Sequence, residues 1–122
     1  MAELIRSCCE NGSVLSEVLH SLPNDEHVGE IAFVFQALSD PTRLKIVLAL
    51  LRYEMCVGEI ANMLELSPSN TSHQLKILRL AKIVTYKKEG QMYFYRLKDA
   101  CIEEVILSTL KHLKLEIPQK EA

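Results

Sequence analysis

Two helix-start signals constrain the fold of this chain more than any other feature. Ser39-Asp40-Pro41 and Ser67-Pro68 each place a capping side chain directly before a proline. Proline suits the first position of a helix, where its missing N–H would have no partner in any case. The preceding carboxylate or hydroxyl accepts hydrogen bonds from the free N–H groups of the first turn. We therefore expect helices to begin at about residues 41 and 68.

The second of these helices has the polar face of a DNA-recognition helix. A short helix over residues 57–64, a turn, and a helix over residues 69–81 form a predicted helix-turn-helix. Asn and Gln offer a donor and an acceptor together, as base edges require, and short Ser side chains allow a close approach to the major groove. The side chains expected to contact DNA from this helix are Ser69, Asn70, Ser72, His73, Gln74 and Lys76.

An alternating segment follows the polar helix. Residues 83–88 and 92–97 are rich in β-branched and aromatic side chains, and Glu89-Gly90-Gln91 separates them as a turn. This pattern predicts a β-hairpin. A helix-turn-helix followed by such a hairpin is a winged helix-turn-helix, so the predicted fold class is mainly α with a β-hairpin wing.

The charge of the chain is small but unevenly distributed. The net charge is -2, yet residues 67–97 hold six basic residues against one acid, Glu89. Such clustering is typical of a phosphate-binding face, although a solvated lysine-rich surface has the same composition. We expect phosphate contacts from Lys76, Lys87 and Lys88, with Arg43 as a further candidate.

Length and hydropathy suggest one globular domain. The chain has 122 residues, of which 48% are hydrophobic, and we divide it into a mobile arm over residues 1–26 with room for one short helix, a winged-helix domain over 27–117 and a tail over 118–122. The longest apolar run, residues 46–51, is too short to cross a bilayer, and the N-terminus has no signal-peptide core. We therefore expect a cytoplasmic protein with no membrane partner.

The terminal segment predicts self-association. Residues 100–115 place an apolar stripe on one helical face, and a terminal amphipathic helix on so small a domain usually packs against another subunit. The expected assembly is a homodimer. The stripe consists of Ile102, Val105, Ile106, Thr109, Leu110 and Leu113.

Four cysteines are too few and too irregularly spaced for a disulfide framework. Cys56 is expected in the first turn of its helix, where the helix dipole favours the thiolate, and Glu59 follows on the same face. Each also has an ordinary explanation, because a lone Cys is usually core and a first-turn Glu complements the dipole.

The adjacent Cys8 and Cys9 have no packing reason to lie in a polar arm, and neighbouring cysteines rarely form an unstrained disulfide. The fourth cysteine is Cys101.

The sequence resembles the ArsR/SmtB family of metal-responsive winged-helix repressors. The resemblance covers about residues 31–113 and is most specific in the SxxSHQLxxL pattern of the recognition helix. It implies a homodimer that occupies an inverted-repeat operator in double-stranded DNA and releases it when an inducer ion binds. It is carried by ALSDPTRLKIV from Ala37, EMCVGEIA from Glu54, LSPSNTSHQLKILR from Leu66 and KKEGQMYFYRL from Lys87.

The resemblance implies a first metal site beside the helix-turn-helix. In the family a cysteine-bearing arm reaches the start of the helix at residues 57–64, in some members across the dimer, and joins ligands at the positions of Cys56 and, less constantly, Glu59. The expected ligands are Cys8, Cys9, Cys56 and Glu59. Thiolates select Zn(II), Cd(II) or Pb(II), with Cu(I) and As(III) less favoured.

A second family site spans two antiparallel terminal helices. Asp99, Cys101 and His112 match its pattern. The fourth position holds Leu115, which cannot ligate, and Glu116 is out of register by one residue. Asp99 is also a good N-cap, and His112 can be an ordinary surface histidine, although three ligands and a water would still form a zinc site.

The resulting hypothesis is a DNA-binding repressor that senses a thiophilic metal ion and needs no organic cofactor. A redox-sensing repressor, in which Cys8 or Cys9 oxidises onto Cys56, is the alternative. A thiol enzyme is not predicted, because the sequence has no Cys-x-x-Cys, no βαβ pattern and no visible Cys–His pairing. An adaptor that binds protein instead of DNA is disfavoured by the polar recognition face.

Overall fold

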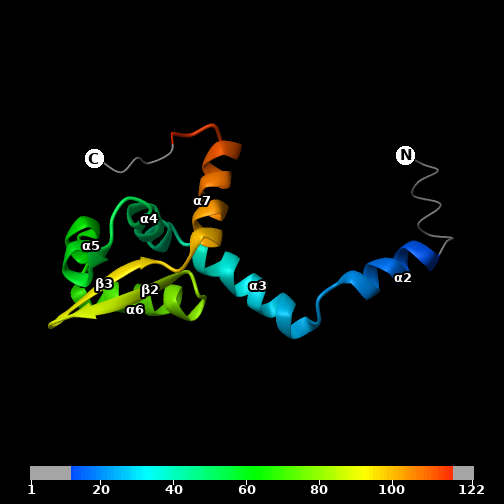
Figure 1. The fold of residues 1–122 in the computed structure, drawn as a ribbon, viewed down its shortest axis with the longest axis horizontal. Coiled ribbons are helices and arrows are strands. Elements are labelled where there is room, and N and C mark those ends of the chain that lie inside the picture. The colour runs from blue at the N-terminus through cyan, green and yellow to red at the C-terminus, as the bar shows by residue number, and fades with distance from the viewer. Residues whose placement is uncertain (1–11, 117–122) are drawn as a thin grey trace. The chain divides into compact units, whose positions relative to one another are not determined.

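A computed structural model describes residues 12–116 of the chain. The chain divides into two compact units, Met1–Ile31 and Ala32–Ala122. In the first unit, helix α2 (Gly12–Ser21) has no buried residue, and helix α3 (Asp25–Leu38) begins two residues before the predicted domain boundary at residue 27 (Figure 1). The division into arm, domain and tail stays a prediction.

Both predicted helix starts are confirmed in the second unit. Helix α4 (Pro41–Leu50) is capped by Asp40, whose Oδ2 accepts from the Arg43 N–H at 3.0 Å. Helix α6 (Pro68–Leu80) likewise begins at a capped proline. The cap-plus-proline signal identified both starts because it reflects a local hydrogen bond that needs no tertiary contact.

The helix-turn-helix consists of α5 and α6. Helix α5 spans Val57–Leu64, and Glu65 turns the chain sharply after it with a left-handed φ of 56°. The two helices pack against each other. A non-glycine residue in the left-handed region is disfavoured by about 1 kcal/mol, so packing between the helices must hold this turn.

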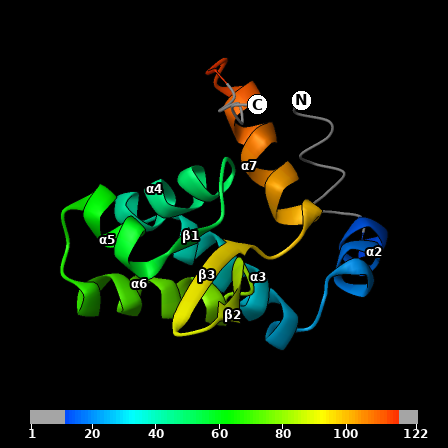
Figure 2. The same ribbon diagram turned by 60° about the vertical axis from the view of Figure 1, so that its left-hand side comes forward.

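The predicted hairpin is also confirmed. Strand β2 (Val84–Glu89) pairs antiparallel with strand β3 (Met92–Leu97), and Gly90 supplies the turn with a φ of 62°. Figures 1 and 2 show the hairpin beside α6, and β2 contacts that helix. The fold is therefore a winged helix-turn-helix with the wing next to the recognition helix.

A third strand was not predicted from the sequence. Strand β1 (Met55–Cys56) pairs antiparallel with β3 and gives the sheet the order β1-β3-β2. Cys56 lies opposite Phe94 and is the N-cap of α5, with extended backbone angles, so it precedes the first turn in which it was expected. Two residues are too short to show an alternating pattern, and only the neighbouring β3 makes them a strand.

One hydrophobic core holds these elements together. α7 (Ala100–His112) packs against β3 and contributes Ile106 to the core. Burying each large aliphatic side chain contributes about 1.5–3 kcal/mol. No helix within residues 12–116 is long and apolar enough to span a membrane. The most deeply buried apolar side chains are Ile46, Val47, Ile60, Leu75, Leu78, Ile83 and Val84.

Candidate nucleic-acid interface and metal-ligating residues

Helix α6 is fixed by its cap and by its inner face. The Ser67 Oγ accepts from the Asn70 N–H at 3.1 Å. Thr71 is fully buried, and its hydroxyl donates to the Ser67 carbonyl at 3.0 Å. The hydroxyl is therefore satisfied, and the buried Thr71, Leu75 and Leu78 leave only the opposite face for recognition.

The opposite face of α6 carries the predicted DNA-contacting side chains. Gln74 differs from the others because it is half-buried, whereas the rest are exposed. A helix turns by about 100° per residue, so Gln74 lies next to the inner stripe. The exposed members are Ser69, Asn70, Ser72, His73 and Lys76.

Arg43, a candidate phosphate contact, is engaged within the protein. Its Nε donates to the Ala37 carbonyl at 2.8 Å, and its Nη2 donates to the Gln36 carbonyl at 3.4 Å. Its Nη1 donates to Gln74 Oε1 at 3.1 Å. Arg43 thus joins the end of α3 to the recognition helix. No local pattern indicates this contact, because Arg43 and Gln74 are 31 positions apart.

The two wing lysines lie on opposite faces of the hairpin, because successive side chains of a strand alternate. The Lys87 ammonium pairs with Glu54 at 3.3 Å and Glu89 at 3.4 Å, and these carboxylates raise the pKa of Lys87. The Lys88 ammonium instead lies 5.6 Å from the centre of the Tyr93 ring. The positive charge of Lys87 is therefore partly neutralised by neighbouring carboxylates, and that of Lys88 lies over an aromatic face.

An aromatic cluster supports the Lys88 side of the wing. Tyr86 contacts Tyr93 edge-to-face at 5.2 Å between ring centres and Tyr95 at 5.3 Å. The Arg79 guanidinium lies 5.4 Å from the Tyr86 ring and so links the end of α6 to the hairpin. Burial raises the pKa of Tyr95. This arrangement brings the cations of Arg79 and Lys88 to one face of the wing.

Cys56 and Glu59 meet at the start of α5. Cys56 is 8% exposed and is a free thiol. The Glu59 Oε1 accepts from the Cys56 N–H at 3.0 Å, and this hydrogen bond lowers the pKa of Glu59. A cavity of about 250 Å³ adjoins Cys56, Gln91 and Met92. The structural role of Glu59 as a helix cap is therefore real, and it uses one of the two carboxylate oxygens.

The remaining predicted ligands are not brought together within the described residues. Cys8 and Cys9 lie outside residues 12–116. Asp99 caps α7 by accepting from the Ile102 N–H at 3.0 Å, while Cys101 and His112 are exposed. Along α7 these two are separated by about 16 Å, so they cannot share an ion within one chain. Within residues 12–116 no three His, Cys, Asp or Glu side chains form a metal-binding group.

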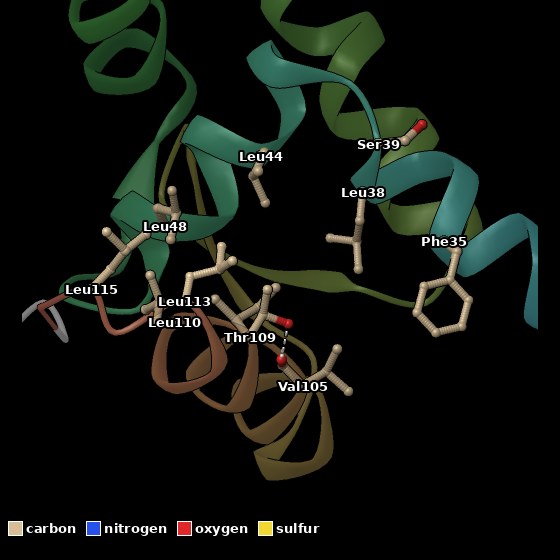
Figure 3. A pocket seen from close by; sticks show the side chains of 11 residues that line it. Phe35, Leu38, Ser39, Leu44, Leu48, Val105, Thr109, Leu110, Leu113 and Leu115 are labelled. Carbon is tan, nitrogen blue, oxygen red and sulfur yellow. Dashed lines mark hydrogen bonds between the residues drawn. The ribbon is translucent and has the colours of Figure 1, made fainter.

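An apolar groove lies between α3, α4 and α7, with a volume of about 360 Å³. Figure 3 shows side chains from all three helices around it. Phe35 on α3 is 61% exposed and Leu113, just after α7, is 58% exposed. Exposed apolar surface of this kind usually marks a contact surface. The groove is lined by Phe35, Leu38, Ser39, Leu44, Leu48, Val105, Ile106, Thr109, Leu110, Leu113 and Leu115.

Comparison with known families matches the helix-turn-helix region. The family model described as "Bacterial regulatory protein, arsR family" matches residues 40–86, from the cap of α4 into β2. The cadmium resistance transcriptional regulatory protein CadC homolog of Staphylococcus aureus is 39% identical over 84 residues, which are 68% of this chain and 69% of that protein. The transcriptional repressor SmtB homolog of Synechocystis sp. is 38% identical over 85 residues, 70% of this chain and 64% of that protein.

A solved structure has the same fold. It is the solution structure of a homodimeric winged helix-turn-helix DNA-binding domain from Mycobacterium bovis, described as a possible ArsR-family transcriptional regulator. Its TM-score is 0.68 at 21% sequence identity, and the likeness covers 84% of this chain and 99% of that one. The agreement identifies the fold as a winged helix-turn-helix.

Two serines at the start of α6 allow stability and recognition to be separated. We expect Ser67→Ala to lower the free energy of unfolding by about 1 kcal/mol, because the Asn70 N–H loses its acceptor. Ser69→Ala removes only an exposed contact of 3.3 Å with the Ser67 hydroxyl, so it should change the free energy of unfolding by less than about 0.5 kcal/mol. Urea unfolding followed by circular dichroism measures both. Equal destabilisation by the two substitutions would contradict the assigned cap.

Proposed function

The chain belongs to the ArsR family of bacterial regulatory proteins, and we propose that it is a transcriptional repressor that binds operator DNA and releases it when a thiophilic metal ion binds. Members of this family are DNA-binding regulators and not enzymes. A DNA-binding role would place the protein in the cytoplasm with the chromosome. The relatives named CadC and SmtB support metal sensing without distinguishing Zn(II), Cd(II) and Pb(II).

The observation that carries the DNA-binding proposal is the exposed polar face of α6 beside a cationic wing. Ser69, Asn70, Ser72 and His73 would enter the major groove, while Lys76 and the wing lysines would contact phosphates. Gln74, which is half-buried, would lie at the edge of the groove-facing set. Two copies would place two such helices on an inverted repeat, with half-sites about 34 Å apart.

The wing lysines provide a matched pair for this proposal. We expect Lys88→Gln to lower DNA affinity and to reduce the slope of log affinity against log salt by about one. Lys87→Gln should change the slope less, because Glu54 and Glu89 already neutralise part of its charge. Fluorescence anisotropy with a labelled duplex over a salt series measures both slopes. A larger decrease in slope for Lys87→Gln than for Lys88→Gln would contradict the assignment of Lys88 as the stronger phosphate contact.

A homodimer is supported by the groove between α3, α4 and α7, because a second copy would cover its exposed leucines and Phe35. We expect Phe35→Glu to shift the protein from dimer to monomer in sedimentation equilibrium, since it places a charge in an apolar contact. Leu80→Glu on α6 is the control, because Leu80 is similarly exposed, at 60%, but lies outside the groove. A monomeric wild type, or a dimeric Phe35→Glu variant, would contradict this interface.

The proposed sensing site combines Cys56 and Glu59 with Cys8 and Cys9. The described part fits a soft or borderline divalent ion, because it offers one thiol and a carboxylate whose second oxygen is not used by the cap. A bound ion would supply strong bonds to thiolate and carboxylate. Cys56 is paired with Phe94 in the sheet, so a change at its side chain would also move the wing strand.

Release of DNA requires that the metal ion bind two conformations of the dimer with unequal affinity. A near-complete switch needs a difference of about 5 kcal/mol in the binding free energy of the ion. An ion that bound both conformations equally would cause no release. Asp99, Cys101 and His112 remain candidates for a second site shared between two copies of α7. Their separation within one helix means that this site would depend on the homodimer.

The metal proposal predicts a spectroscopic and a functional loss in the same variant. On titration with Cd(II), the wild type should develop thiolate-to-metal charge-transfer absorption and lose affinity for its duplex. Cys56→Ser should weaken both effects, because a thiolate ligand is removed. Cys101→Ser is the comparison for the second candidate site, and loss of both effects in Cys101→Ser with an unchanged Cys56→Ser would assign sensing to α7 instead of α5.

The result also separates metal sensing from the redox alternative. DNA binding that is unaffected by stoichiometric Cd(II) would contradict metal sensing. Loss of DNA binding on peroxide treatment of a chelated sample, restored by a thiol reductant, would instead support oxidation of Cys8 or Cys9 onto Cys56. Retention of the Cd(II) response in Cys56→Ser would exclude the site at α5 as the sensor.

A further inference from the structure

Arg43 makes three side-chain hydrogen bonds that cross from α3 to α6. Two of them use the Gln36 and Ala37 carbonyls in the last turn of α3, and the Gln36 carbonyl also accepts from the Ser39 N–H and hydroxyl. The third goes to Gln74 on the recognition helix at 3.1 Å. The Arg43 backbone is itself fixed by the Asp40 cap. A half-buried guanidinium held by three elements has little freedom to turn toward a phosphate.

These bonds determine how the Gln74 amide is oriented. A guanidinium has only donors, so the atom of Gln74 that faces Arg43 must be the amide oxygen. The Gln74 amino group is then turned the other way and donates to Asn70 Oδ1 at 3.4 Å. The hydrogen bonds therefore run in a single direction, from Arg43 through Gln74 to Asn70.

The direction of this chain decides how the Asn70 amide faces. Its oxygen is turned toward Gln74, so its amino group is turned away from Gln74. The oxygen has a second lone pair, so Asn70 still offers an acceptor beside its amino donor. Base reading by an asparagine depends on the orientation of both groups, and here that orientation is set by Gln74.

We propose that Arg43 is a positioning residue for sequence recognition, which acts through Gln74 to fix the orientation in which the Asn70 amide faces the bases. The inference rests on the proposed DNA-binding function. It assigns Gln74 to orientation of its neighbour and removes Arg43 from the phosphate contacts. It also gives α3 a direct connection to the base-reading side chains.

The test compares sequence discrimination with general DNA affinity. The full-length wild type is used to select duplexes from a randomised pool, and the position read by Asn70 is the one whose preference Asn70→Ala relaxes. Arg43→Lys keeps the charge but cannot bond Gln74 and both α3 carbonyls at once. We expect it to reduce discrimination at that position about tenfold, with less than a twofold change in affinity for an unrelated duplex.

The Asn70→Ala background distinguishes a positioning role of Arg43 from a purely structural one. In the Asn70→Ala background, Arg43→Lys should cause no further loss of discrimination, because the two residues act in series. Lys45→Arg, on the exposed side of α4, should leave discrimination unchanged.

Two results would overturn the inference. They are unchanged discrimination in Arg43→Lys, and a parallel fall in affinity for both duplexes with a lower melting temperature. Failure of the wild type to enrich any duplex would instead contradict the proposed DNA-binding function itself.

Discussion

The burial of one face of α6 is the constraint on which the rest of the structure depends. Thr71, Leu75 and Leu78 are fully buried against the core, so the rotation of the helix about its axis is fixed. With that rotation fixed, the side chains between these positions must point outward. The polar residues of α6 are therefore oriented by the packing of their apolar neighbours, and a substitution that loosened this packing would also change how the polar face is presented.

The short strand β1 makes the wing continuous with the start of α5. Cys56 belongs to both, since it pairs with Phe94 and caps the helix. Glu54, two residues earlier, reaches Lys87 across the sheet. A ligand at Cys56 would therefore act on a residue that already contacts the helix-turn-helix and the hairpin, and no long relay would be needed to connect an ion with the DNA-facing elements.

Local sequence patterns predicted the helix starts and the hairpin, but they did not predict the long-range contacts. The starts of α4 and α6 and the hairpin follow from caps, prolines and alternation, and each of these signals lies within a few consecutive residues. The two-residue β1 exists only because β3 lies beside it. The bond between Arg43 and Gln74 depends on how α4 meets α6, and nothing in either segment indicates it. The predicted metal ligands stay untested, since Cys8 and Cys9 lie outside residues 12–116.

The charge distribution explains how a chain with a net charge of -2 can suit a polyanion. Some acids lie in the first turns of α3 and α7, at Asp25, Glu26 and Glu103, where they complement the helix dipoles. Six basic residues lie within residues 67–97, which hold α6 and the wing, and there Arg79 and Lys88 lie over tyrosine rings. Positive charge concentrated on these elements would orient the proposed regulator as it approaches DNA. Because the total charge is small, affinity for unrelated sequences would stay modest, and specificity would come from the few side chains that α6 presents.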